Sequence, residues 1–336
     1  MATFVLQALG CDVSAINTVN FSNHTAYKQF KGRRTPAEEI QEIYNGLKEA
    51  DLNHFDVMLS GYAASKHAVE TIGGIGRDQR LKSSTRPGSF FWILDPVMGD
   101  QGRLYVSEDI VPAYRTLIRD ADLILPNSFE ASQLAEIEVT DMASLVAAIT
   151  KIHKQYQVPH IIVTSLNLSP RTGRRFSNAD KIAVVGSSCC SDYSPRLFSV
   201  TVPSLPIFFS GTGDMFASLM LVRLREAVTS INADMLTKKS WQSPDDVPAT
   251  SLPLAKATEK VLASMQTILE KTVAARDADL ADETSTNGES EEDARRMHLR
   301  RTRASEVRVV ECVQDLQHPD MQQPGVSKAE MVQIDA

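Results

Sequence analysis

Cysteine is scarce in this sequence, and its cysteines are not spaced for a shared task. The four are Cys11, Cys189, Cys190 and Cys312, and no two of them form a C-x-x-C pair. Disulfide frameworks and structural zinc sites need several cysteines at regular spacing. The sequence therefore argues against both, and we expect reduced thiols.

Long apolar runs and an excess of basic residues are also missing. No stretch reaches the 18 apolar residues that a membrane-spanning helix needs. The formal net charge is −7 and the pI is about 5.6, which argues against nucleic acid as a partner, since binding its phosphates needs a basic face. A local basic pocket for a small phosphate ligand is still compatible with this charge.

The first ten residues, MATFVLQALG, are apolar but contain no Lys or Arg. A signal peptide carries a positively charged start and a cleavage site. This segment is more typical of a short helix closed by Gly10. We therefore expect a cytosolic or nuclear protein with no membrane partner.

Two common nucleotide-binding motifs are absent. The chain has no G-x-x-x-x-G-K-[ST] sequence and so is not a P-loop protein. No G-x-G-x-x-G follows a first strand, which weakens the case for a dinucleotide site. The stretch GGIGRDQ resembles that motif only loosely, and we predict that residues 73–89 form a mobile loop.

Short apolar runs alternate with amphipathic helical patterns through the first half of the chain. The clearest helical pattern has apolar residues at i, i+3 and i+4 spacing from Met142 to Ile152. This alternation is typical of βαβ units, and it predicts an α/β fold with a mostly parallel sheet. The predicted buried strands lie within residues 55–62, 90–100, 121–130 and 160–165.

The second half of the chain has a different pattern. Residues 169–209 are rich in turns and contain the runs KIAVVG and LFSVTV, which predict antiparallel strands at one edge of the sheet. Helices are predicted again at 213–228 and 253–274. Residues 275–305 are highly charged and poor in aromatics, which predicts a disordered insert. The segment SEVRVVECVQDL, at 305–316, predicts an edge strand.

Two segments near the N-terminus carry local signals. Residues 12–22, DVSAINTVNFS, are β-branched and partly alternating, which predicts a strand. The segment TPAEEIQEIYNGLKEA predicts a helix, with Thr35 and Glu38 at capping-box spacing and Pro36 at the first helical position.

Polar residues follow each predicted strand of the parallel part. Open α/β sheets bind their ligands beyond the carboxyl ends of their strands. The topology therefore predicts that these residues gather at one edge. They are Ser60, Gly61, Tyr62, Asp95, Asp100, Asn127, Glu130, Thr164 and Ser165.

The stretch FFSGTGDMFA, residues 208–217, places a carboxylate beside two glycines at the start of a predicted helix. A helix N-terminus presents free N–H groups and a partial positive charge, and glycines let a ligand come close, so this end suits a phosphate. Asp214 fits a simple helix cap. It also fits a general base that takes a proton from a hydroxyl while the amides hold the transferred phosphoryl group.

Phosphoryl transfer also needs a cation that bridges phosphate oxygens. Mg²⁺ prefers hard oxygen ligands, usually one or two carboxylates with water. Asp95, Asp100 and Glu130 are the available carboxylates. Each of them also fits ordinary turn or helix-start chemistry.

Together these segments resemble the ribokinase-like superfamily: GTGD opens a late helix, DPVMGD follows one strand and PNSFE follows the next. Within it, NTVNFSNHTAY, GLKEADLNHFDVMLSGY and ITKIHKQY followed by HIIVTSLNL resemble the pyridoxal kinase family. The resemblance covers about residues 2–230 and is weaker at 253–274 and 304–320. It implies a single ribokinase-like domain over 1–336, with a central, mostly parallel sheet flanked by helices on both faces.

The resemblance also implies an activity: ATP-dependent phosphorylation of the 5′-hydroxymethyl group of pyridoxal, and usually of pyridoxine and pyridoxamine. It implies a homodimer that needs Mg²⁺ or a similar divalent cation, often with K⁺.

Site residues carry over from the family's motifs one by one. Asp214 matches the catalytic base, and Gly211, Thr212 and Gly213 match the anion hole. The metal and phosphate neighbourhood corresponds to Asp95 and Glu130, with Asp100 and Asn127 beside them. Thr164 and Ser165 match nucleotide-phosphate contacts, and the wall of the vitamin pocket corresponds to Phe21, Thr25 and Tyr62.

The chain departs from the family pattern at its start and at two other positions. Family members usually begin with a further strand and a glycine-rich stretch, which are absent before MATFVLQALG. We therefore expect an unpaired sheet edge and weak or no activity, because unpaired strand edges are costly. Leu125 stands where the family often has Thr, which bears on K⁺ binding. Ser210 precedes GTGD where a small apolar residue is usual, which bears on substrate choice.

Two alternatives remain open from the sequence. One is a kinase of the same superfamily with another substrate, such as hydroxymethylpyrimidine. The other is a non-catalytic remnant that binds nucleotide or dimerises.

Overall fold

The computed structural model describes residues 1–166, 181–281 and 290–332. Its main sheet has the strand order β11-β10-β9-β8-β7-β4-β3. The parallel part consists of β3 (Val57–Ser60), β4 (Phe91–Leu94), β7 (Leu123–Ile124) and β8 (His160–Leu166). The antiparallel part consists of β9 (Lys181–Cys189), β10 (Pro195–Pro203) and β11 (Glu330–Met331). The predicted parallel strands and antiparallel edge are therefore confirmed.

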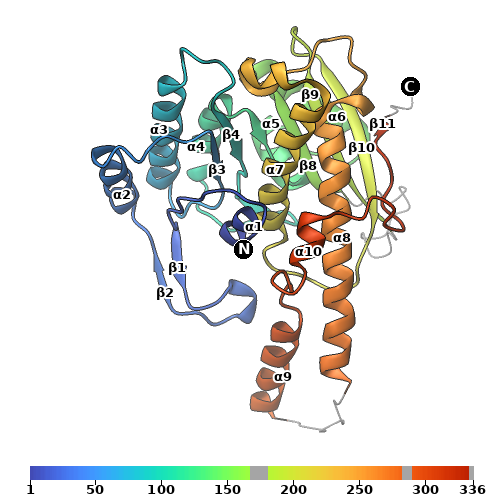
Figure 1. Cartoon of the computed structure of the whole chain (residues 1–336). Coiled ribbons are helices and arrows are strands. Elements are labelled where there is room, and N and C mark those ends of the chain that lie inside the picture. The colour runs from blue at the N-terminus through green and yellow to red at the C-terminus, as the bar shows by residue number, and fades with distance from the viewer. Residues whose placement is uncertain (167–180, 282–289, 333–336) are drawn as a thin grey trace.

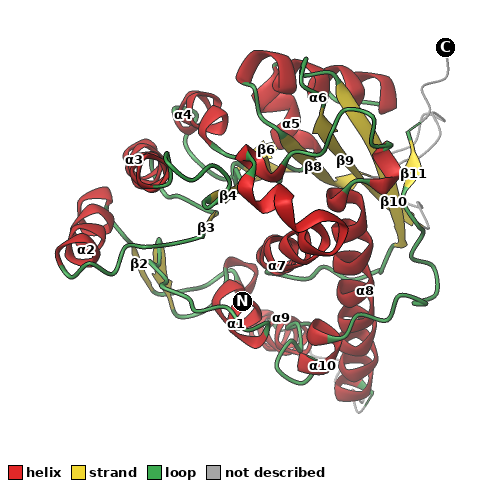
Figure 2. Ribbon diagram, turned by 45° about the horizontal axis from the view of Figure 1, so that its top comes forward, coloured by secondary structure: helices red, strands yellow, loops and turns green. Residues whose placement is uncertain are grey.

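Helices cover both faces of this sheet (Figure 2). Strand β4 shows why, because its side chains alternate between two apolar cores: Phe91 and Ile93 face one, Trp92 and Leu94 the other. The first core is covered by α1 (Ala2–Ala8), α7 (Thr212–Asn232), α8 (Pro253–Leu280) and α10 (Val313–Gln317). The second is covered by α2 (Ala37–Glu49), α3 (Lys66–Lys82), α4 (Ile110–Leu117), α5 (Ser128–Ala135) and α6 (Met142–Tyr156). The predicted fold class is confirmed.

Strand β3 lies at the end of the sheet opposite β11. Within the described part of the chain its strand partner is β4, and Val57, Met58 and Leu59 are half-buried. Val5 and Leu6 of α1 are buried in the core shared with α7. The described residues include no helix that is both long and apolar enough to cross a bilayer.

Two small hairpins stand apart from the main sheet. Strands β5 (Gly99–Asp100) and β6 (Arg103–Leu104) form one of them. Strands β1 (Val19–Phe21) and β2 (Gly32–Arg34) form the other, which we call the hairpin arm (residues 19–34) and which extends away from the sheet (Figure 1). Gly32 is required there, because a Cβ at this position would lie 1.9 Å from the Asn20 carbonyl oxygen. The strand predicted at 12–22 therefore forms only over its last residues.

The prediction of a loop at residues 73–89 is wrong for most of that range. Residues 73–82 belong to α3, which Ser65 caps by accepting a hydrogen bond from the Ala68 N–H, and only 83–89 form turns. The glycines here serve close packing: a Cβ at Gly76 would lie 2.3 Å from the ring of Trp92. A glycine-rich helix that packs tightly looks like a loop in sequence.

The prediction of disorder at 275–305 is also wrong for the described residues. Helix α8 continues to Leu280, and α9 spans Glu291–Ala304 after Ser290, whose Oγ accepts from the Asp293 N–H. The acidic first turn and basic last turn of α9 suit its helix dipole. Residues 282–289 lie outside the described part.

Three local predictions have mixed outcomes. Gly10 follows α1 with a φ of +85°, which confirms the helix end. The capping box at Thr35 is wrong, because the Thr35 hydroxyl donates to the Asn17 carbonyl and Pro36 is the N-cap residue. The edge strand at 305–316 is also wrong, because this segment forms turns leading into α10 and buries Leu316 in the core.

Candidate functional site

The carboxyl ends of the parallel strands lie side by side, as the topology predicts. The Asp95 N–H donates to the Ser60 carbonyl at 2.8 Å, and the Thr164 N–H donates to the Pro126 carbonyl at 3.0 Å. Asn127 and Thr164 form a parallel bridge. The structure therefore places the residues after β3, β4, β7 and β8 along one edge.

Helix α7 begins at this same edge. Gly211 has a φ of +82° and forms the N-cap without a side-chain hydrogen bond, so the first N–H groups of the helix receive no cap from that residue. A Cβ at Gly213 would lie 3.7 Å from Asp95 Oδ2. The GTGD turn and the carboxylate after β4 therefore face each other.

Four carboxylates share this neighbourhood. Burial raises the pKa of Asp95 well above its usual range, and the charges of Glu130 and Asp214 raise it further. Burial raises the pKa of Glu130 to about 7; three backbone N–H donors oppose this, and the charge of Asp100 adds to it. These mutual effects show a concentration of negative charge at the strand ends.

Asp214 is exposed to solvent at the first turn of α7. The protein atoms around it nevertheless raise its pKa by desolvation, while the N-terminal ammonium of Met1 lowers it. Its carboxylate has no hydrogen-bond partner among the described residues, whereas the Asp214 carbonyl accepts from the Ser218 hydroxyl at 2.6 Å. The carboxylate is therefore accessible and has a raised proton affinity, as a general base needs.

Glu130 has a structural task that the sequence signal did not reveal in full. Its Oε1 accepts from the Met98 and Gly99 N–H groups at 2.8 and 3.3 Å, and its Oε2 accepts from the Asn127 N–H at 2.9 Å. Asn127 in turn caps α5 and donates to the Gly99 carbonyl. Glu130 and Asn127 thus fix the DPVMGD turn against α5.

The other predicted metal and phosphate residues are placed as follows. Asp100 lies in the β5–β6 hairpin, where its Oδ1 accepts from the Gln101 N–H at 2.8 Å. Ser165 is exposed at a bulge of β8 with a φ of +60°. Across the described ranges, no three His, Cys, Asp or Glu side chains are grouped closely enough to hold a metal ion. The metal-ligand roles stay predictions.

The predicted vitamin-pocket residues divide into two groups. Tyr62 lies at the strand ends, where it shares an electrostatic environment with Tyr114, Asp95 and Glu130. Phe21 packs on Phe30 within the hairpin arm, with ring centroids 4.6 Å apart. Thr25 is exposed in the turn η1 (Thr25–Tyr27). The Thr18 hydroxyl links the base of the arm to the Tyr62 carbonyl at 2.7 Å.

The sequence did not predict a place for Tyr114 in the candidate site. It is buried on α4, its hydroxyl lies 3.4 Å from the Gly61 carbonyl, and burial together with the charges of Asp95 and Glu130 raises its pKa. In the sequence, Tyr114 looks like any other buried apolar or aromatic residue of a core helix. The pattern of α4 therefore does not predict that its hydroxyl lies beside the acidic cluster.

Comparisons with known proteins identify the family. The profile of the phosphomethylpyrimidine kinase family matches residues 13–233. A Schizosaccharomyces pombe protein provisionally named as a pyridoxal kinase is 34% identical over 271 residues, or 81% of this chain and 79% of that protein. The pyridoxal kinase of Ovis aries is 33% identical over 229 residues, or 66% of this chain and 70% of that enzyme.

Solved structures agree with this result. The pyridoxal kinase of Leishmania donovani in complex with ADP and pyridoxamine superimposes with a TM-score of 0.72 at 29% identity, covering 95% of this chain and 90% of that one. The match extends over nearly the whole of both chains. The chain therefore belongs to the pyridoxal kinase family and has its ribokinase-like fold.

Proposed function

We propose that the chain transfers the γ-phosphoryl group of ATP to the 5′-hydroxyl of pyridoxal, and also of pyridoxine and pyridoxamine. The single observation that carries the proposal is the placement of an accessible carboxylate, Asp214, on the open N-terminus of α7, facing Asp95. The names of the relatives support the substrate class, and the ADP complex of the Leishmania donovani enzyme supports the nucleotide.

The proposed reaction gives a role to each group of residues at this edge of the sheet. Asp214 takes the proton of the 5′-hydroxyl as the new O–P bond forms, and the bond from the γ-phosphorus to the bridging oxygen breaks to release ADP. The backbone N–H groups of 211–213 hold the transferred phosphoryl oxygens, where charge develops. Asn127, Thr164 and Ser165 lie along the same edge, where they would contact the nucleotide phosphates.

The acidic residues suit a divalent cation that is shared with the nucleotide phosphates, because such an ion needs only one or two carboxylates from the protein. Asp95 and Glu130 carry raised pKa values, and the structure shows no hydrogen-bond donor to the Asp95 carboxylate among the described residues. Asp95 and Asp100 would hold the ion, while Glu130 keeps its backbone donors. A bound Mg²⁺ neutralises phosphate charge during the transfer. The side chain of Leu125 is buried and offers no oxygen for K⁺; K⁺, a homodimer and a cytosolic or nuclear location stay predictions.

A substrate panel tests the proposal. The purified chain, ATP and Mg²⁺ are incubated with pyridoxal, pyridoxine, pyridoxamine or hydroxymethylpyrimidine, and phosphorylated product is measured. We expect turnover with the three vitamin B6 forms. Preference for hydroxymethylpyrimidine would instead support a kinase of the same superfamily that acts on that substrate. Folded protein that binds ATP but phosphorylates none of the four would support a non-catalytic remnant.

A further inference from the structure

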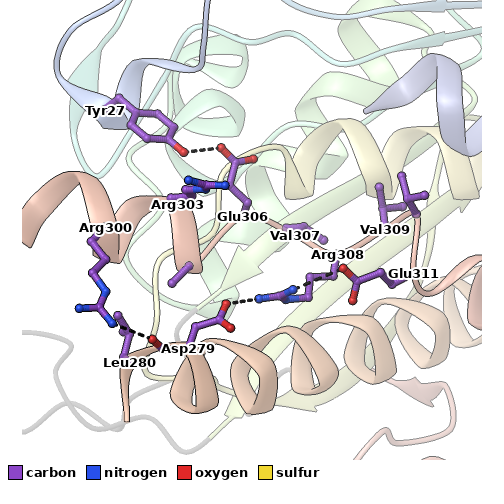
Figure 3. Close-up of a pocket in the computed structure, with 12 residues that line it drawn as sticks. Tyr27, Asp279, Leu280, Arg300, Arg303, Glu306, Val307, Arg308, Val309 and Glu311 are labelled. Carbon is purple, nitrogen blue, oxygen red and sulfur yellow. Dashed lines mark hydrogen bonds and ion pairs between the residues drawn. The ribbon is translucent and has the colours of Figure 1, made fainter. Parts of the chain in front are cut away.

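The tip of the hairpin arm is held by a residue far along the chain. The Tyr27 hydroxyl donates to Glu306 Oε1 at 2.7 Å, and His24 Nε2 lies 3.2 Å from the same oxygen (Figure 3 shows the Tyr27 bond). The rings of His24 and Tyr27 are themselves in contact, with centroids 4.8 Å apart. One carboxylate therefore joins two residues of the 22–31 loop between β1 and β2.

Helix α9 adds two further contacts to this loop. Arg295 Nη2 donates to Gln29 Oε1 at 2.7 Å, and His298 Nε2 lies 3.1 Å from the Ala26 carbonyl oxygen. We call Arg295, His298 and Glu306 the α9 brace. The partners of these three residues lie within η1 and on both sides of it.

The brace is fixed to the body of the protein through α8. Arg276 of α8 donates to the Ser305 hydroxyl at 3.1 Å, beside Glu306, and Arg300 of α9 donates to the Asp279 carbonyl at 3.0 Å. Arg308 pairs with the Asp279 carboxylate (Figure 3). These bonds attach to the last turns of α8, beyond its last buried residue, Thr272, and α8 itself is anchored in the core through its buried residues from Pro253 to Thr272.

The arm's own contacts are local: besides the Phe21–Phe30 packing, the Ser22 N–H donates to the Lys31 carbonyl at 2.8 Å and Asn23 Nδ2 donates to the Gln29 carbonyl at 2.7 Å. Its strands pair over three residues each, and an isolated two-stranded hairpin is marginally stable in water. A pocket of about 690 Å³ lies between Tyr27 and the C-terminal end of α8. The brace supplies hydrogen bonds that tie the loop to the rest of the protein, which the local contacts of the arm do not.

Tyr27 keeps its proton at neutral pH, which the bond to Glu306 requires. Burial and the hydrogen bond to Glu306 raise the pKa of Tyr27 to about 12, and the neighbouring Arg303 opposes this. The hydroxyl therefore remains a donor throughout the physiological range.

We propose that the α9 brace positions the 22–31 loop for the vitamin, with Glu306 as the main positioning residue. The loop carries Thr25 and adjoins Phe21, the two arm residues predicted to line the vitamin pocket. The kinetic consequence rests on the proposed function, whereas the ordering of the loop does not. Glu306 acts through Tyr27 and His24 and does not itself touch the reacting atoms.

The kinetic test compares Glu306→Ala with Glu70→Ala. Glu70 lies on α3, is as exposed as Glu306 and pairs with Lys66 at 3.8 Å, so it is a matched loss of one carboxylate outside the brace and its anchor. We expect Glu306→Ala to raise KM for pyridoxal about 10-fold, the effect of losing one or two hydrogen bonds. The values of kcat and KM for ATP should stay within about 2-fold, and Glu306→Gln, which can still accept from Tyr27, should recover most of the loss.

Hydrogen exchange of the free protein gives the second readout. Amides of 22–31 should exchange about 10-fold faster in Glu306→Ala than in Glu70→Ala, while those of β4 and β8 stay unchanged. Equal loop exchange in the two variants would overturn the brace. Faster loop exchange with an unchanged KM for pyridoxal would overturn its positioning role. If wild type phosphorylates no vitamin form, the proposed function fails, and the exchange comparison still decides whether the brace orders the loop.

Discussion

The strand-end cluster (Asp95, Glu130 and Asp214) and the hairpin arm are held in place by different kinds of contact. Backbone hydrogen bonds at the edge of the sheet fix the first: the Asp95 N–H donates to the Ser60 carbonyl, and the Glu130 carboxylate accepts from three backbone N–H groups. Asp214 is placed by the first turn of α7. Side-chain bonds from residues more than 260 positions away fix the tip of the second, such as Arg295 to Gln29. The proposed chemistry thus lies on the rigid core, and the proposed vitamin recognition lies on a separately supported arm.

This difference has a practical consequence. The strand ends cannot move without disturbing the sheet, because their positions are set by the ladder itself. The arm can loosen while the sheet stays intact, since few of its contacts belong to the core. Substitutions at the strand ends should therefore lower kcat with little change in KM for pyridoxal. Substitutions in the brace should raise KM for pyridoxal with little change in kcat.

Apart from the loss of Asp214 itself, the largest effect is expected at the anion hole. In Gly213→Ala the new Cβ would lie 3.7 Å from Asp95 Oδ2, an ordinary contact that the fold tolerates. The methyl group would nevertheless occupy the approach to the N–H groups of α7. We expect kcat to fall about 10²- to 10³-fold, as when an oxyanion donor is lost, with an unchanged Tm and little change in KM for pyridoxal. Steady-state kinetics showing the Glu306→Ala pattern instead would break the distinction between the regions.

A pH effect on stability should belong to the core alone. His153 is buried, with Nδ1 2.6 Å from the Val158 carbonyl and Nε2 2.8 Å from the Ser187 hydroxyl. Burial lowers the pKa of His153 from 6.5 to about 4, and burial also lowers that of His160. Because the folded state disfavours the charged ring, the stability that His153 contributes is complete above pH 6.5 and is lost as the pH falls towards 4.

The difference between 6.5 and about 4 corresponds to roughly 3 kcal/mol for His153. Urea unfolding at pH 7 and pH 5 should show this loss in part, and His153→Gln should show a shallower dependence on pH. A slope unchanged by His153→Gln would mean that this ring does not link protonation to folding.

The smallest of these effects concerns α3, behind the strand ends. Gly76→Ala would place a Cβ 2.3 Å from the ring of Trp92, whereas the exposed Gly74 has nothing within 4 Å. We expect Gly76→Ala to destabilise the protein by about 1–3 kcal/mol, the cost of overpacking. The control Gly74→Ala should stabilise it by about 0.5–1 kcal/mol. Chemical denaturation measures both, and a neutral Gly76→Ala would show that this packing is loose.

The sequence predicted the strand-end region well because its signals are local. Apolar runs followed by polar residues gave the strands, and a glycine pair before Asp214 gave the helix start. The roles of Asp214 and its neighbours remain predictions, but the edge on which they gather follows from parallel topology alone. What the pattern could not give was Glu130 as a cap for the 98–99 backbone, since that depends on how the turn folds back.

The arm and its support were predicted poorly, and for a physical reason. Residues 290–304 are highly charged, and composition alone indicates disorder, yet their partners lie on α8 and on the 22–31 loop. Such contacts join residues hundreds of positions apart and leave no periodic pattern. The error in α3 has another source: Gly73 and Gly76 are there to fit Leu117 and Trp92, and a single sequence cannot distinguish that need from flexibility.

The most direct test of the account is ATP-dependent formation of pyridoxal 5′-phosphate by Asp214→Ala beside wild type. Asp214 is exposed, so the variant should fold with the same Tm and bind ATP. Loss of a general base predicts turnover lower by about 10²- to 10⁴-fold. Wild-type turnover in a folded Asp214→Ala would contradict the assignment of phosphoryl-transfer chemistry to the start of α7.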